Sequence, residues 1–247
     1  KDGRLARITA ISGPGVYRAD RYPASYAGAA FIPEPAANAV TSHLFKETDK
    51  GLGIAEHKLF PDENFQKREF LCSTDERFRP VNVYSGPDGC IYIVDLYRGI
   101  LQHKVYVTGF YLKPYILERK LEVPVGMGRI YRIVHTAKGR DKIQPRLLSA
   151  STTELIKTLS HPNGWWRDAA QRLLVERNDP KSVPLLKKAV GSAGNHLGRI
   201  HALWTLEGMN ALDLTTIETG LKDEHNKVQM TALVISGRMR ATADQDK

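Results

Sequence analysis

A phrase that occurs twice in the first half of this chain constrains its fold more than any other feature. Each copy has an aromatic residue followed by arginine, then a glycine turn, a short apolar strand and an acidic residue. The copies begin at Tyr17 and Phe78 and end at Glu34 and Asp95, at a common offset of 61 residues. Such repetition is typical of successive blades of a β-propeller. Since two blades do not close a ring, the sequence predicts only the last part of one.

Up to about Val134, short apolar or alternating runs lie between Gly, Pro, Asn and Asp, which is the pattern of strands and turns. Residues 85–89 predict a hairpin turn, because Pro87 presets φ and Gly89 tolerates a positive φ. Residues 111–121 have a more helical pattern.

From Ser151 the apolar period changes to that of paired helices. The second helix of each pair carries an alanine three residues after Arg167, Arg199 or Gln229, at offsets of 32 and 30 residues. A small residue at one helical phase lets neighbouring helices approach closely, as in a stacked α-solenoid. Helices are expected over residues 152–160, 163–176, 180–190, 197–209, 214–221 and 227–239.

The predicted fold is therefore mixed, β then α: a partial β-propeller, consisting of its last blades, followed by an α-solenoid of HEAT-like helical pairs. Residues 1–140 would form the C-terminal blades, and residues 145–247 three HEAT-like helix pairs. The N-terminus lacks the apolar stretch of a signal peptide and enters a pattern already under way, which indicates a segment of a longer protein.

The net charge of +9 is concentrated between these two regions. Residues 96–142 contain ten Lys or Arg and three acids, a net of +7. Two interpretations are open: a solvated basic loop, or a docking face for an acidic partner, an anionic substrate or a carboxylate-bearing cofactor. Nucleic acid is disfavoured, because no recognition-helix or RNP-type motif accompanies the charge.

Several classes of site have no motif here. No apolar run reaches the roughly 18 residues of a membrane-spanning helix. Cys72 and Cys90 stand outside any CxxC or CxxCH motif, so both are expected as unpaired thiols, with Cys90 packed as a small hydrophobe. Nucleophile-elbow, zinc-protease, P-loop and dinucleotide-binding motifs are absent from the sequence. No catalytic residue, metal ligand or cofactor is assigned by motif.

Two arginines and the residues around them are the candidate binding groups. Because Arg18 and Arg79 share one phase of the repeat, both guanidiniums are expected at the mouth of a propeller channel, where they suit carboxylates, phosphates or sugar hydroxyls. The alternative is a structural arginine that bridges blades through Glu34 or Asp95. These acids end equivalent strands, where they either cap turn amides or act as metal or substrate ligands.

Residues after Asp95 extend the same rim. Tyr97 would add a stacking surface and Arg98 a second cation. His103 ends a strand-like run, either as a ligand or as a satisfied structural residue. The candidate cofactor- or substrate-binding set is Arg18, Arg79, Asp95, Tyr97, Arg98 and His103.

Several phrases together resemble a known family over nearly the whole chain. They comprise residues 15–18, 31–36, 78–89, 94–103, 128–133 and 161–168. They look like the large bacterial "membrane-bound dehydrogenase" proteins. The resemblance implies a propeller of glucose/sorbosone-dehydrogenase type with HEAT-like repeats, often followed by a c-type cytochrome domain, in an exported, periplasmic protein. It also implies oxidation of a sugar or alcohol by pyrroloquinoline quinone with calcium, and transfer of electrons to haem c.

The chain departs from that family pattern in two places. The blades that hold the histidine base of soluble quinoprotein dehydrogenases are not recognised here, and there is no CxxCH for haem. What the resemblance implies is a fragment of an oxidoreductase, inactive alone, with a cytochrome or another acidic partner at residues 96–142. The alternative is a non-catalytic scaffold that binds carbohydrate or protein.

Overall fold

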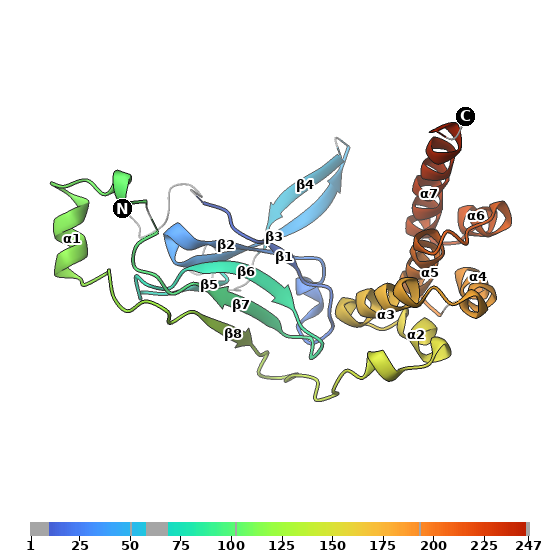
Figure 1. Ribbon diagram of the computed structural model, residues 1–247, viewed down its shortest axis with the longest axis horizontal. Coiled ribbons are helices and arrows are strands. Elements are labelled where there is room, and N and C mark those ends of the chain that lie inside the picture. Colours follow the sequence, from blue (N-terminus) through green and yellow to red (C-terminus); the bar gives the residue numbers. More distant parts are fainter. Residues whose placement is uncertain (1–9, 50, 58–68, 102, 193, 246–247) are drawn as a thin grey trace. The chain divides into compact units, whose positions relative to one another are not determined.

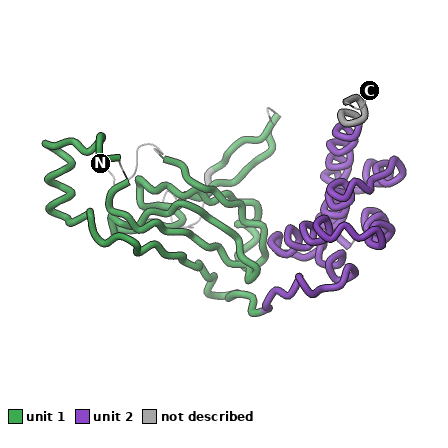
Figure 2. Tube along the Cα trace, in the orientation of Figure 1, with its two compact units in different colours: residues 1–142 green, residues 143–247 purple. Residues whose placement is uncertain are grey.

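The computed structural model describes residues 10–49, 51–57, 69–101, 103–192 and 194–245. The chain divides into two compact units, residues 1–142 and residues 143–247 (Figure 2). In the described part of the chain, the first unit holds eight strands and helix α1, and the second holds helices α2 to α7 (Figure 1).

The larger sheet of the first unit has the order β1-β2-β3-β4, with β5 beside the start of β3. Its antiparallel strands are Gly15–Val16, Ala30–Glu34, Ala39–Thr48, Gly51–Glu56 and Leu71–Cys72. Asn38 closes the turn between β2 and β3 at φ 56°, a left-handed conformation that asparagine tolerates. Its side chain donates to the Phe78 carbonyl at 2.6 Å, which ties this turn to the start of the second sheet.

The smaller sheet consists of β6 (Pro80–Ser85), β7 (Ile91–Asp95) and β8 (Arg129–Ile133), again antiparallel. The hairpin predicted at residues 85–89 is confirmed, because β6 pairs with β7 and Gly89 has a φ of 76°. Between β7 and β8 lie the 3-10 helix Lys104–Tyr106 and helix α1, Leu112–Glu118. Both cysteines are free, and Cys90 is buried as predicted.

The two sheets share one apolar core and meet at β6. The N–H of Gly13 donates to the Val81 carbonyl at 2.8 Å, and Gly13 forms a parallel bridge with β6. A Cβ at Gly15 would lie 2.5 Å from the Val83 carbonyl oxygen. The close approach of β1 to β6 therefore requires glycine at this position. The core contains Tyr17, Tyr22, Phe31, Val40, Val83, Ile91 and Ile93. Each aliphatic or phenylalanine side chain among them contributes about 1.5–3 kcal/mol by leaving water.

The prediction of a partial propeller followed by a solenoid is wrong. Over the described residues the structure is a mixed α/β arrangement of two small antiparallel sheets, of five and three strands, and seven helices, with no ring of blades. The repeated phrase is not a structural repeat, because Arg18 follows β1 whereas Arg79 precedes β6. Only the strand that ends in a buried acid is common to both copies, β2 with Glu34 and β7 with Asp95.

The second unit consists of α2 (Thr152–Thr158), α3 (Gly164–Arg177), α4 (Val183–Ser192), α5 (His196–Gly208), α6 (Leu214–Leu221) and α7 (Asn226–Gln245). The first five helices lie close to their predicted ranges, whereas α7 continues six residues beyond the predicted end at Met239. Side-chain caps begin four of them. Ser151 and Glu154 form a capping box at α2, and Asn163, Asn195 and Asp213 accept backbone N–H groups at α3, α5 and α6.

Small residues let these helices pack closely. Ala170, Ala202 and Ala232, which the sequence places at one helical phase, have no exposed surface. A Cβ on Gly220 would lie 2.9 Å from the Cβ of Ala232. The close packing of α6 against α7 therefore depends on small residues on both helices. The surrounding core includes Leu155, Leu174, Leu186, Leu203, Leu206 and Ile235.

Candidate functional site

Arg79 is held by main-chain oxygens. Its Nε donates to the Arg98 carbonyl at 2.8 Å, its Nη1 to the Pro35 carbonyl at 2.8 Å and its Nη2 to the Gly99 carbonyl at 2.9 Å. Burial lowers the pKa of this guanidinium. All three nitrogens therefore join the chain leaving β7 to the turn after β2.

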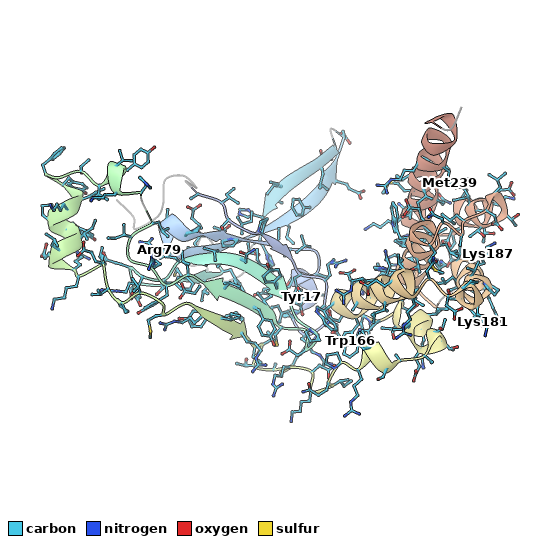
Figure 3. All side chains as sticks on the ribbon, in the orientation of Figure 1. Tyr17, Arg79, Trp166, Lys181, Lys187 and Met239 are labelled. Carbon is cyan, nitrogen blue, oxygen red and sulfur yellow. The ribbon has the colours of Figure 1, made fainter. Side chains whose placement is uncertain are left out.

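Arg18 lies at the opposite end of the sheets. It is exposed and follows Tyr17, whose hydroxyl donates to the Gly89 carbonyl in the β6–β7 turn at 2.9 Å. The six residues of β6 separate that turn from Arg79 by about 20 Å. Figure 3 shows Tyr17 and Arg79 at the two ends of the sheets. The structure therefore does not bring Arg18 and Arg79 to a common rim, contrary to prediction.

Asp95 fixes the chain as it leaves β7. It is 1% exposed, and its Oδ1 accepts the backbone N–H groups of Arg79 and Tyr97, both at 2.8 Å. Glu34, the acid at the end of β2, is also 1% exposed and accepts the Ala10 N–H at 2.8 Å through Oε1. Both carboxylates make the contacts of amide caps, one of the two roles considered from the sequence.

Tyr97 follows in a strained conformation. Its φ of 49° lies in the left-handed region, which a bulky residue rarely adopts. The Asp95 cap holds its amide, the Arg129 guanidinium lies 3.8 Å from its ring centroid, and a hydrogen bond to Asp75 raises the pKa of its phenol. Arg129 thus covers one face of the ring that was predicted to stack on a ligand.

Arg98 and His103 are exposed, and His103 immediately precedes the 3-10 helix after β7. Arg98 borders a surface hollow of about 260 Å³ whose other lining residues are Gly99, Ile100, Leu121, Glu122, Pro124 and Val125. The structure brings together four of the six candidates: Arg79, Asp95, Tyr97 and Arg98.

Residues 100–127, here called the arm, run from the end of β7 to β8 and include α1, which extends away from the sheets (Figure 1). Two side chains that precede β6 hold the arm in place. Arg77 donates to the carbonyls of Arg119 at 3.2 Å and Val123 at 3.0 Å. Glu76 accepts from Nη1 of Arg119 at 2.6 Å. These hydrogen bonds hold the part of the arm from Arg119 to Val123 against the residues that precede β6.

The arm exposes ten large hydrophobic side chains. Phe110 is 90% exposed, Val105 74% and Tyr111 71%. The others are Leu101, Tyr106, Tyr115, Leu117, Val123, Val125 and Met127. Four cations on or beside the arm have no acidic partner among the described residues: Arg98, Lys104, Lys113 and Lys120. Composition indicated the charge, whereas the apolar exposure follows only from the structure.

Over residues 1–137, the chain matches the sequence profile of a family described as a domain of unknown function (DUF7133). The chain belongs to this family. The DUF7133 region covers both sheets and the arm, so each candidate residue above lies within it. No curated protein matches the chain. In this DUF7133 protein, none of the described helices combines the length and the apolar character needed to cross a membrane.

The quinone implied by the resemblance does not fit the two arginines together. A group held by its carboxylates needs arginine donors that face one space. In this DUF7133 chain, Arg79 donates to three carbonyl oxygens and Arg18 lies at the other end of the sheets. Within the described ranges, no three His, Cys, Asp or Glu side chains are grouped as metal ligands.

A contact between Ser42 and His57 has no signal in the sequence. The Oγ of Ser42 and the Nδ1 of His57 lie 2.7 Å apart, and burial lowers the pKa of His57. Serine beside a neutral imidazole can be an activated nucleophile. Here the two side chains are only 9% and 5% exposed, so the pair belongs to the interior of the DUF7133 unit.

Proposed function

We propose that this chain is a binding module whose arm docks an acidic protein partner. The observation that supports this most is that one segment, anchored at residues 119–123 by Arg77 and Glu76, exposes ten large hydrophobic side chains in its described part. Fixing the backbone costs about 1–2 kcal/mol per residue. The arm buries little in return, since Ile116 and Leu121 are the large hydrophobic side chains buried in its described part.

The residue types on the arm suit a protein interface. Contiguous exposed apolar surface rimmed by polar groups commonly marks a site of protein interaction. Aromatic residues, methionine and arginine are enriched at such interfaces, and the arm exposes Tyr106, Phe110, Tyr111 and Met127 beside Arg98. A partner that covers these side chains would bury the apolar surface that the arm leaves in water.

The charge of the arm indicates the chemistry of that partner. Lys104, Lys113 and Lys120 stand among the exposed hydrophobic residues without acidic partners in the described part of the chain. Complementary charge steers association and excludes partners of like charge. A surface rich in Asp and Glu is therefore the expected counterpart.

The proposal is tested by titrating the whole chain with a random copolymer of glutamate and tyrosine, and with a lysine–tyrosine copolymer as the charge-reversed control. Only the glutamate copolymer should bind, and binding should weaken with added salt because screening acts over about 8–10 Å at physiological ionic strength. Phe110→Ser and Lys113→Glu change exposed side chains of the arm. Each should weaken binding several-fold without lowering the melting temperature.

Lys46→Glu is the matched control, because Lys46 is an exposed lysine on β3, outside the arm. This variant should bind the glutamate copolymer as the wild type does. Equal binding of both copolymers, or unchanged binding by Phe110→Ser and Lys113→Glu, would contradict the proposal.

The family resemblance suggests one form of this partner. If the complete protein oxidises a sugar or alcohol, a cytochrome with an acidic surface is the partner expected on the arm. Sugar-dependent dye reduction by the full-length protein, with added quinone and calcium, tests that oxidation. The binding proposal does not depend on its outcome.

A further inference from the structure

A groove lies between α2 and α4 in the second unit. Its volume is about 340 Å³, and it is lined by residues of both helices together with Ser160 and Gly194. Neither the candidate residues nor the arm belong to this unit.

The two walls of the groove are matching helix faces. On the α2 side the lining residues are at positions 153, 156, 157 and 160, and on α4 they are at positions 185, 188, 189 and 192. Both sets follow the spacing i, i+3, i+4, i+7, which is one face of a helix, and they are related by a constant offset of 32 residues. The groove lies between these two ridged faces.

The groove lining combines apolar side chains with one lysine from each wall. Ile156, Leu185 and Ala189 supply apolar surface, and Leu185 is 41% exposed. Lys157 and Lys188 have no carboxylate partner among the described residues, and the lining contains no acid. The neighbouring Lys187 is different, because its Nζ donates to Asp213 at 2.6 Å.

We propose that this groove binds a short amphipathic helix with acidic residues on both sides of its apolar stripe. Each wall spans eight residues, with a rise of about 10 Å from the first to the last, or two turns of a bound helix. Apolar side chains spaced three and four apart would enter the furrow between Ile156 and Leu185. Acidic residues flanking that stripe would reach Lys157 on one side and Lys188 on the other.

A helix fits this groove better than a fatty acid does. A single carboxylate head group carries one negative charge and would leave one of the two lysine charges, Lys157 on α2 or Lys188 on α4, uncompensated. An amphipathic helix presents carboxylates along both edges of its apolar stripe. Two ridged walls also match the ridges of a third helix. This inference is independent of the partner proposed for the arm.

The test uses the whole chain and a fluorescein-labelled peptide of about four helical turns, with leucines in one stripe and glutamates on both flanks. The double variant Lys157→Glu/Lys188→Glu alters two exposed side chains. It should weaken binding at least about tenfold, since two attractive pairs become repulsive. Leu185→Asp should weaken binding similarly. Lys181→Glu, whose side chain is exposed and not in the groove lining, should leave binding unchanged.

Fluorescence anisotropy measures the binding, and circular dichroism at 222 nm checks that each variant keeps its helices. Equal binding of a peptide with the same composition and a scrambled stripe would overturn the proposal. Unchanged affinity of the folded double variant would also overturn it. If dodecanoate binds and the peptide does not, the groove is a lipid site instead.

Discussion

The carbonyl oxygen of Gly99 accepts a hydrogen bond from Nη2 of Arg79 at 2.9 Å, across 20 residues of sequence. Gly99 also lies against Leu121 of the arm, since a Cβ on Gly99 would lie 2.4 Å from the Leu121 carbonyl oxygen. The residue before the arm and Leu121, in its second half, therefore meet at one point, where only glycine leaves room. Arg79 acts there as a structural clamp.

Replacing the clamp should loosen the arm and destabilise the first unit. Arg79→Lys keeps the charge but lacks the planar fork that reaches three carbonyls. We expect a loss of about 2 kcal/mol in the free energy of unfolding, because hydrogen bonds from charged donors contribute about 1.5–3 kcal/mol and the site is half-exposed. The melting temperature should fall by roughly 4–8 °C. Arg98→Lys, on the exposed neighbour, should change the stability by less than about 0.5 kcal/mol.

Because Tyr97 has a left-handed backbone conformation, we expect glycine at this position to be more stable than alanine, the reverse of the usual order. Both Tyr97→Gly and Tyr97→Ala remove the ring contact with Arg129, but only alanine retains the strain at a φ of 49°. The glycine variant should be the more stable by about 1 kcal/mol in denaturant unfolding. At Val94, in the regular strand β7, glycine should instead be the less stable of the two. The same order at both positions would contradict the assigned strain.

The helices of the second unit could be predicted because their signals are local. Asn163 and Asp213 cap α3 and α6 from adjacent positions, and the apolar period lies within each helix. The first unit is different, because its contacts join distant segments. Gly13 bridges to β6 and Arg77 reaches the arm 42 residues later. No pattern in the sequence indicates such pairings.

The repeat at 61 residues misled for a physical reason. The repeat reflects one real similarity: the strands β2 and β7 both end in buried acids that cap backbone amides. It does not report what each strand pairs with. In the first copy, β2 pairs with β1, a strand that precedes Arg18 in the chain. In the second copy, β7 pairs with β6, a strand that follows Arg79. Because the pairing differs, the two arginines lie at opposite ends of the sheets although their spacing to the acids is equal.

The cap of α3 should contribute measurably to the stability of the second unit. Asn163 is 2% exposed, and its Oδ1 accepts the Trp165 N–H at 3.0 Å. Asn163→Ala should lower the free energy of unfolding by about 1 kcal/mol, within a range of 0.5–2. Asn163→Ser keeps an acceptor at the cap and should lose much less. Urea unfolding monitored by tryptophan fluorescence measures the difference, and equal losses would rule out the cap as the cause.

The stacked pair His196 and His225 predicts how the second unit responds to acid. The ring centroids lie 3.9 Å apart with an interplanar angle of 9°. Burial, and then the neighbouring His225, lowers the pKa of His196 from its usual value of 6.5. The unfolded chain therefore takes up a proton on His196 before the folded chain does. Stability should be constant above about pH 7 and decrease as the pH falls below about 6.5.

Tryptophan fluorescence isolates this effect, because all three tryptophans, Trp165, Trp166 and Trp204, belong to the second unit. Unfolding midpoints at pH 7.5 and pH 5.5 should differ in the wild type. His196→Phe keeps a ring on His225 without a titratable group, so the difference should shrink. His103→Gln, on the exposed arm of the other unit, should leave it unchanged. If His196→Phe retains the full difference between pH 7.5 and pH 5.5, a group other than the His196 imidazole causes the loss of stability in acid.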